Sequence, residues 1–298
     1  ARFTFIPNGI RVGMTPDLMQ DITVLIDSFL TLNRCPTGAV RSLAGKANHV
    51  AGLVYCWRPF LADLWAAIKK ATTGGRDHPF IWTRQIRSCL TWLRAFLRRE
   101  KGTLVRTYLL QHHFNQEPPY TIAFDASPWG LGGVLVQHGR VKEALMSPLT
   151  HHDEQRFQHK IGSCKGQQTW ESLSMLVCMR TWKRYWAEGR SNITLQGDSM
   201  TALYMATKLK ASGYGTNIVA RELALDLGDA AYRPDSVQHI PGVSNEVPDY
   251  LSRLLEPGNT KQPPPSSWQG AVDVIPPVRD ESWYMSLDHR CDKRTREL

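Results

Sequence analysis

The sequence predicts a mainly helical N-terminal module, then a mixed α/β (α+β) domain, then a disordered tail. Three observations lead to this division. Apolar residues recur at helical spacing from about residue 15 to 113. The paired prolines of "NQEPPY" (115–120) cannot continue a helix and indicate a linker. From residue 120 onward the apolar positions alternate, as they do in strands. We therefore expect modules at 1–117 and 118–256, with the tail at 257–298.

The first module is predicted from amphipathic stretches such as "LMQDITVLIDSFLTL" and "RQIRSCLTWLRAFLRRE". Residues 1–117 contain 16 Lys and Arg against 7 Asp and Glu, whereas the rest of the chain contains 20 of each, so the whole net charge of +9 lies here. A basic excess confined to one module favours a polyanionic partner, most often nucleic acid. An ordinary basic surface that keeps the protein soluble is the alternative.

The second module is predicted to have the element order βββαβααβα. A His-Gly turn at 138–139 separates two alternating stretches and indicates a hairpin. The elements are a strand "YTIAFDA", the hairpin strands "GGVLVQHG" and "RVKEALMSP", a helix near 167–187, a strand "NITLQGD", helices near 199–208 and 216–231, a strand "SVQHI" and a helix from 245.

The tail, the cysteines and the first residue give predictions about disorder, cellular compartment and origin. "KQPPPSSWQG" and the charged end that follows it are typical of disorder or of a linker. The six cysteines lack C-x-x-C spacing, which favours a reduced, intracellular protein, cytoplasmic or nuclear. No run approaches the roughly 20 apolar residues of a membrane span, so we expect no membrane partner. The sequence does not begin with Met, and we expect it to be part of a longer polyprotein.

Four acidic residues occupy positions in the predicted strands and helices where a charged side chain is not the simplest choice. Asp125 ends the first strand beside a Pro-Trp-Gly turn, and Glu171 heads an apolar stripe of its helix. Asp198 ends the fourth strand, and Asp249 lies one turn into the last helix. Singly, a turn aspartate, a helix N-cap and a first-turn acid would explain three of them. Glu171 is harder to explain, because a charge on an apolar stripe costs free energy unless it is paired.

The order of elements and the four motifs resemble a known family. "FDASPWGLGGVL", "QTWESLSML", "LQGDSMTALYM" and "HIPGVSNEVPDYLSRL" are similar to the motifs of the ribonuclease H domain of retroelement reverse transcriptases. The resemblance covers residues 118–256 and implies a five-stranded mixed sheet flanked by helices. It also implies an endonuclease that hydrolyses the RNA strand of an RNA/DNA hybrid, with Asp125, Glu171, Asp198 and Asp249 as catalytic carboxylates.

The implied cofactor is a pair of Mg²⁺ ions, with Mn²⁺ as a substitute, because hydrolysing a phosphodiester requires an activated water and a stabilised leaving oxygen. Asp125 would be the ligand shared by both ions. Glu171 and Asp198 would complete one site and Asp249 the other. The candidates for contacts to the 2′-hydroxyls of the hybrid are Ser127, Gln196, Ser199 and Asn245.

The helical module has a resemblance of its own. "SLAGKANHVAGLVYCWRPFLADL" is similar to the thumb or connection segment of retrotransposon reverse transcriptases, especially those of the tyrosine-recombinase type. The resemblance implies that Lys46 and Arg58 help to grip a nucleic-acid duplex. A generic amphipathic connector would show the same periodicity.

The sequence also departs from these families. No F/Y-x-D-D sequence occurs, so the chain should not polymerise DNA by itself, and a polymerase palm from the same polyprotein is a candidate partner. Pro248 and Tyr250 replace the family's usual alanines. If Asn245 caps the last helix, Pro248 falls in the first turn, where a missing N–H is tolerated. His239 is a candidate proton shuttle, although it is predicted to end a strand.

Two alternatives remain open. A catalytically inactive retroelement remnant would bind nucleic acid, or serve as a structural module, without cleaving it. An integrase or resolvase of the same fold would prefer duplex DNA to a hybrid.

Overall fold

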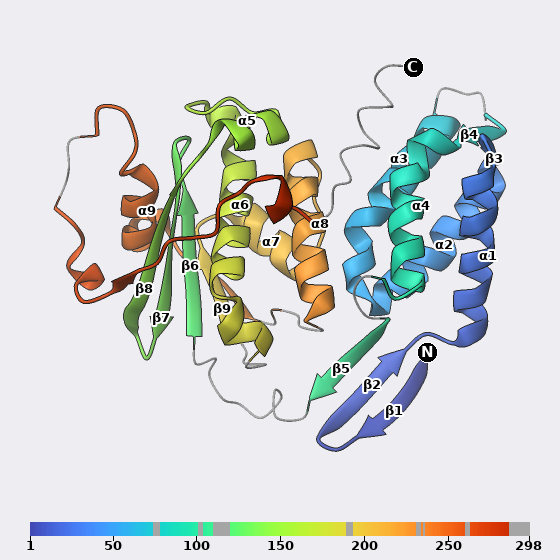
Figure 1. Cartoon of the computed structure of the whole chain (residues 1–298), viewed down its shortest axis with the longest axis horizontal. Coiled ribbons are helices and arrows are strands. Elements are labelled where there is room, and N and C mark those ends of the chain that lie inside the picture. Colours follow the sequence, from blue (N-terminus) through green and yellow to red (C-terminus); the bar gives the residue numbers. More distant parts are fainter. Residues whose placement is uncertain are drawn as a thin grey trace. The chain divides into compact units, whose positions relative to one another are not determined.

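The computed structural model describes residues 1–73, 78–100, 104–109, 120–188, 193–230, 234, 236–259 and 263–285 of the 298-residue chain (Figure 1). These residues form two compact units. The first comprises residues 1–114 with 224–231, and the second comprises 115–223 with 232–285. No helix in the described part of the chain is both long and apolar enough to cross a membrane. The predicted linker 115–119 lies outside the described residues.

The first unit is built on four helices whose apolar faces meet. The aromatic rings of Phe60 and Phe96 pack edge to face with their centroids 5.4 Å apart. Helix α4 follows the predicted amphipathic spacing, because its buried residues are concentrated on one face, including Ile86, Leu90 and Leu93. The helices are α1 (Pro16–Thr31), α2 (Thr37–Leu53), α3 (Ala62–Thr72) and α4 (Thr83–Leu97).

The prediction of a mainly helical module overlooked two small sheets in this unit. Strands β1 (Arg2–Ile6), β2 (Gly9–Gly13) and β5 (Val105–Leu109) form a three-stranded antiparallel sheet. Strands β3 (Arg34–Pro36) and β4 (Phe80–Trp82) form a two-stranded antiparallel ribbon. The β1–β2 turn uses Asn8 at φ 64°, a left-handed conformation that Asn tolerates better than most residues.

The second unit holds a mixed sheet of six strands in the order β10-β9-β6-β7-β8-β11. Strands β6, β7 and β8 form an antiparallel meander, whereas β9 runs parallel to β6 and β10 runs parallel to β9. The first five strands are β6 (Tyr120–Ala126), β7 (Gly130–Gln137), β8 (Arg140–Pro148), β9 (Ile193–Gly197) and β10 (Ser236–His239). The predicted hairpin turn is confirmed, because His138 and Gly139 both have positive φ, as a type I′ turn requires.

Helices cover both faces of this sheet (Figure 1). Helix α6 packs on one face of β6 and β7, and α9 packs on the other. The helices are α5 (His151–Phe157), α6 (Gln167–Thr181), α7 (Met200–Lys208), α8 (Tyr214–Asp229) and α9 (Glu246–Arg253). Helix α5 was not predicted. The predicted helix near 167–187 is present as α6 and a π-helical turn (Arg184–Glu188) that follows it. The second unit thus has the mixed α/β architecture that the sequence predicted.

The glycines of β7 let both helices approach the sheet. A Cβ at Gly132 would overlap the backbone oxygen of Pro248 in α9, and a Cβ at Gly133 would overlap the sulfur of Cys178 in α6. Successive residues of a strand face opposite sides, so each glycine makes room for a different helix. The "GLGG" sequence is therefore explained by close packing around β7.

The expectation of a disordered tail does not hold for residues 263–285. Strand β11 (Val272–Asp273) pairs in parallel with β8 and adds a sixth strand to the sheet. Arg279 is buried, and its guanidinium donates to both carboxylate oxygens of Asp153, at 2.9 and 2.7 Å. The ring of Tyr284 is buried beside Phe157. Proline-rich composition was misleading here, because a few anchoring side chains are enough to fix an otherwise irregular segment.

Candidate active site

Asp125 occupies the sheet face that α9 covers. It is the sixth residue of β6 and shares its face with Ala123, which packs in a core cluster with Val247 and Leu251 of α9. Only 7% of Asp125 is exposed. Its Oδ2 accepts a 2.7 Å hydrogen bond from the hydroxyl of Ser252. The carboxylate is therefore held between a strand end and a helix.

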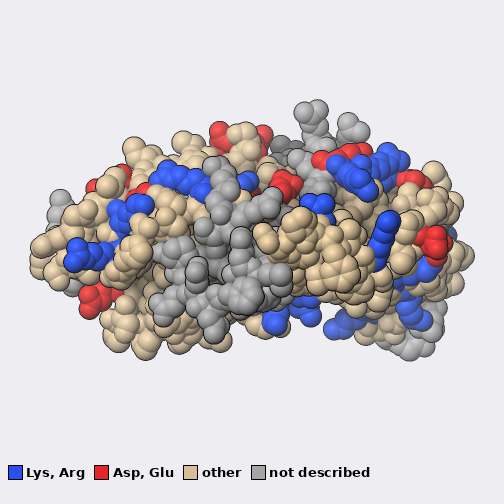
Figure 2. Space-filling view, turned by 90° about the horizontal axis from the view of Figure 1, so that it is seen from below, with Lys and Arg blue, Asp and Glu red and all other residues tan. Residues whose placement is uncertain are grey.

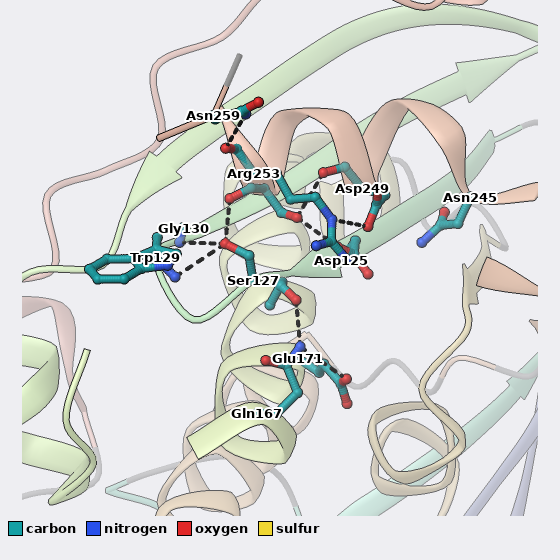
Figure 3. A network of polar contacts seen from close by, with 12 residues as sticks. Asp125, Ser127, Trp129, Gly130, Gln167, Glu171, Asn245, Asp249, Arg253 and Asn259 are labelled. Atoms are coloured by element: carbon teal, nitrogen blue, oxygen red, sulfur yellow. Dashed lines mark hydrogen bonds and ion pairs between the residues drawn. The ribbon is translucent and has the colours of Figure 1, made fainter. Parts of the chain in front are cut away.

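Asp249 and Arg253 lie one turn apart on α9, close to Asp125 (Figure 3). The Nε of Arg253 donates to Oδ1 of Asp249 at 2.6 Å. The hydrogen bond to Asp249 is the largest of the effects that raise the pKa of Arg253. The negative charges of Asp249 and Asp125 raise it further. Asp249 is therefore paired with a cation of its own helix.

Glu171 lies in the first turns of α6, where two side chains hold its carboxylate. Gln167 donates to Oε1 of Glu171 at 3.3 Å and to the backbone oxygen of Ala126 at 2.5 Å, which ties the helix to the end of β6. The hydroxyl of Ser199 is also among the groups that lower the pKa of Glu171. Ser199 is the N-cap of α7, which follows Asp198 directly. The predicted capping role of Asp198 therefore falls to its neighbour.

The pKa shifts link the four carboxylates. Burial is the largest cause that raises the pKa of Asp125, and the charges of Asp198 and Asp249 add to it. The Ser252 hydrogen bond and Arg253 oppose this rise, and together these effects bring the pKa to about 7. Burial likewise raises the pKa of Glu171, with Asp198 adding to the effect and with Ser199 and Gln167 opposing it. Asp198 therefore acts on both buried carboxyls, which indicates one electrostatic site at this edge of the sheet.

The segment after β10 closes the other side of the site. A Cβ at Gly242 would stand 3.1 Å from Oδ2 of Asp198, so this loop passes close to the carboxylate. Asn245 occupies the N-cap position of α9 as expected, but its side chain does not cap the helix. Its Nδ2 instead donates to the backbone oxygen of Phe124 at 2.9 Å, and its buried Oδ1 has no hydrogen-bond partner. Asn245 therefore anchors the loop to the strand that bears Asp125.

Pro248 and His239 are placed as the sequence predicted. Pro248 is the third residue of α9, within the first turn, where no internal hydrogen bond needs its N–H. His239 is the last residue of β10, and its Nε2 lies 3.2 Å from the backbone oxygen of Asp198. The ring is exposed. Its role as a proton shuttle stays a prediction.

The remaining candidate contacts already have hydrogen-bond partners within the chain. Ser127 is 1% exposed, and its hydroxyl donates to the backbone oxygen of Ser252 and accepts from the N–H groups of Trp129 and Gly130. This placement gives it a structural role in the turn rather than a hydroxyl open to a substrate. Gln196 bonds to Gln238 across β9 and β10. Lys46 and Arg58 belong to the first unit, where Lys46 pairs with Asp21 at 2.9 Å and Arg58 donates to the backbone oxygen of Ala51.

Sequence reasoning overlooked three residues of this site, namely Gln167, Ser252 and Arg253. The last two stand in the quoted "DYLSRL" stretch, but only the acid of that stretch was singled out. A hydroxyl three residues after Asp249 and a cation four residues after it lie on the same helical face, which was the available signal. Gln167 stands four residues before Glu171, at the same kind of spacing.

The donor set fits Mg²⁺ in its chemistry. Carboxylate oxygens are the hard ligands that this ion prefers, and the pKa values of Asp125 and Glu171 are raised first by burial and then by neighbouring carboxylates. The ligands are not gathered around one point, however. No three Asp, Glu, His or Cys side chains in the described ranges stand close enough together to hold one ion. An ion that used Oδ1 of Asp249 would compete with Arg253.

Comparisons with known proteins add little to this description. No protein-family model matches the sequence, and no curated protein matches it. Among solved structures, the ribonuclease H1 of the halophilic archaeon Halobacterium salinarum NRC-1 is similar with 19% identity and a TM-score of 0.32, over 44% of this chain and 92% of that one.

Two foamy viral structures are also similar. The protease-reverse transcriptase in complex with RNA/DNA hybrid shares 17% identity at a TM-score of 0.30, over 88% of this chain and 31% of that one. The protease-reverse transcriptase dRH, in complex with double-stranded DNA, shares 14% identity at a TM-score of 0.28, over 80% of this chain and 38% of that one. This chain thus spans between 31 and 38% of the two viral proteins. With all TM-scores below 0.5, a functional assignment has to rest on the chain's own residues.

Proposed function

We propose that the chain is the ribonuclease H part of a retroelement reverse transcriptase, hydrolysing the RNA strand of RNA/DNA hybrids with the help of divalent metal. One observation carries the proposal. The four carboxylates of the sequence motifs lie on β6, α6, the end of β9 and α9, and Asp125 and Glu171 are both influenced by the charge of Asp198. Carboxylates from four separate elements thus influence one another electrostatically, and this coupling supports the proposal.

The site residues divide into ligands and the groups that position them. Asp125, Glu171, Asp198 and Asp249 would hold Mg²⁺, or Mn²⁺ in its place. When bound, the metal supplies an activated water and stabilises charge on the leaving oxygen. Ser252 orients Asp125 and Gln167 orients Glu171 through hydrogen bonds. Asn245 holds the loop after β10 against β6.

The first unit would bind the substrate by charge. Its basic excess favours contacts to phosphates. Figure 2 shows Lys and Arg side chains spread over the surface of this unit, at the right of the view, with fewer acidic side chains between them. A polymerase palm from the same polyprotein would be the natural partner, since the sequence has no F/Y-x-D-D motif of its own.

The test is cleavage of an RNA/DNA hybrid labelled on the RNA strand, by the full chain, in Mg²⁺ and in EDTA. We expect the RNA strand to be cut only with metal, and Asp125→Asn to reduce the rate by at least about 100-fold. The matched control is Asp273→Asn, which makes the same change at an exposed carboxylate on β11 and should leave the rate unaltered. Equal rates for both variants would exclude the proposed site.

A second candidate is an inactive remnant that binds nucleic acid without cleaving it. The ion pair between Arg253 and Asp249 favours it, because a cation already occupies one of the expected ligands. This candidate predicts that a hybrid binds equally well in Mg²⁺ and in EDTA and is never cut. Restored cleavage in Arg253→Ala would show instead that the site is intact but blocked.

A further inference from the structure

The two-stranded ribbon of the first unit presents aromatic rings to solvent. Arg34 pairs with Trp82 and Pro36 pairs with Phe80, whereas the intervening pair, Cys35 and Ile81, is buried. Cross-strand partners lie on the same face of an antiparallel pair, so the outer face carries the side chains of Arg34, Pro36, Phe80 and Trp82. Phe80 is 51% exposed and Trp82 is 43% exposed. Two large rings therefore stand about 7 Å apart along one strand, open to water.

The charged residues of this face are arginines. The guanidinium carbon of Arg34 lies 4.2 Å from the centroid of the Trp82 ring, and that of Arg84 lies 5.6 Å from it. Both arginines are exposed, and neither forms an ion pair with an acidic residue in the described part of the chain. Their positive charge is thus free to meet an anion at the place where the rings are exposed.

We propose that this face, formed by Arg34, Phe80, Trp82 and Arg84, binds unpaired nucleotides of a single-stranded nucleic acid. Each feature has a matching group on that ligand. Exposed rings and guanidinium planes stack on bases, whose faces are otherwise left to water in a single strand. Unpaired arginines attract phosphates, with which a guanidinium forms bidentate hydrogen bonds. A duplex offers the phosphates but hides its base faces.

Charge decides against a protein partner as the occupant. An apolar protein surface would match the rings but leave two arginines desolvated without a counter-charge, which is costly. Residues 1–117, which include the ribbon, hold the whole net positive charge of the sequence, so they attract a polyanion at long range. The inference does not depend on cleavage at the carboxylate site, because binding of a single strand needs neither Asp125 nor metal.

The test is fluorescence anisotropy of a labelled oligothymidylate of about 12 nucleotides, titrated with the full chain in EDTA. We expect Trp82→Ala to weaken binding about tenfold, while Trp82→Phe, which keeps an aromatic face, weakens it by less than about threefold. Trp65 provides a matched control. It is also 43% exposed and lies in α3 of the same unit, and Trp65→Ala should leave the affinity within about twofold. Thermal unfolding checks that each variant is folded.

Two further measurements separate stacking from charge. An abasic strand of the same length should bind the parent chain about tenfold more weakly, and Trp82→Ala should no longer distinguish the two strands. Arg84→Ala should lower the slope of log Kd against log salt concentration by about 0.7, the value for one phosphate contact on a single strand. If Trp82→Ala binds oligothymidylate like Trp65→Ala, or if the abasic strand binds the parent equally well, the inference is wrong and the face carries only a diffuse charge.

Discussion

Arg253 holds Asp249 through a 2.6 Å hydrogen bond between residues one helical turn apart on α9, beside the buried carboxylate of Asp125. The pair is half-exposed, so its free energy is small, about 0.2–1 kcal/mol. A metal ion must overcome this amount to recruit Asp249. Arg253 thus sets a modest threshold for metal binding rather than an absolute block.

Removing that cation should raise the affinity for metal. We expect Arg253→Ala to bind Mg²⁺ or Mn²⁺ about two- to fivefold more tightly in calorimetric titration, as the free energy of the ion pair suggests. The control is Arg98→Ala, which removes a similarly exposed ion pair with Asp27 in the first unit. This variant should bind metal like the parent. Weaker metal binding by Arg253→Ala would mean that the arginine organises the ligands instead of competing for them.

Replacing Gly132 should displace α9 from the sheet. A Cβ at this position would overlap backbone atoms of Pro248 and Ser252, which cannot move without the helix. We expect Gly132→Ala to cost about 2–3 kcal/mol of unfolding free energy and to abolish cleavage, because Asp249 and Ser252 would lose their positions relative to Asp125. Urea unfolding measures the first effect. Gly45→Ala is the control, since open space surrounds this glycine in α2 and the change should stabilise the chain slightly.

Arg279 and Asp153 form a buried ion pair that fastens the tail. Their side chains are 2% and 0% exposed, so removing the cation leaves an uncompensated carboxylate. We expect Arg279→Met to cost about 3–5 kcal/mol in urea unfolding. The exposed Arg140 at the start of β8 is the control, and Arg140→Met should change stability by less than about 0.5 kcal/mol. A small effect at Arg279 would show that the tail is not anchored there.

Glu143 makes the stability of the fold depend on pH. Burial raises the pKa of this carboxyl, but hydrogen bonds from Tyr185 and Trp182 and the charge of Arg184 outweigh it, so the pKa is lowered overall. A carboxyl with a lowered folded pKa stabilises the fold above its unfolded pKa of about 4.3. That contribution is lost as the pH falls through the folded value.

Glu143→Gln tests this sign. At pH 7 the variant should be less stable than the parent by about 1–3 kcal/mol, because the charged hydrogen bonds are weakened. The difference in unfolding free energy should shrink once the pH falls below about 4.3, where the parent also loses its charge. Urea unfolding at several pH values measures it. A difference that stays constant down to pH 3 would contradict the lowered pKa.

Much of the second unit was predictable because its signals are local. The His138-Gly139 turn, the alternation in β6 and the acids at element ends all depend on residues close together in the sequence. The Gln167–Ala126 and Asn245–Phe124 bonds are different. They join residues 41 and 121 positions apart, and no pattern in either segment reveals the partner.

The failures have equally specific causes. Asn8-Gly9 between alternating residues is a known hairpin signal, so β1 and β2 could have been found from the sequence, whereas β5 depends on pairing with β2. Composition suggested that the tail was disordered, but burial of Arg279 and Tyr284 overrides composition.

The position of Arg279 so late in the chain also determines when the fold can be finished. During synthesis the N-terminal parts of a protein emerge first, so Asp153 leaves the ribosome 126 residues before its counter-ion. Until then the carboxylate has no buried cation to meet, and the outer edge of β8 is open to other strands. The nascent chain must therefore wait in an incomplete state, and a message truncated before the codon for Val272 would yield a product whose open β8 edge is vulnerable to edge-to-edge aggregation.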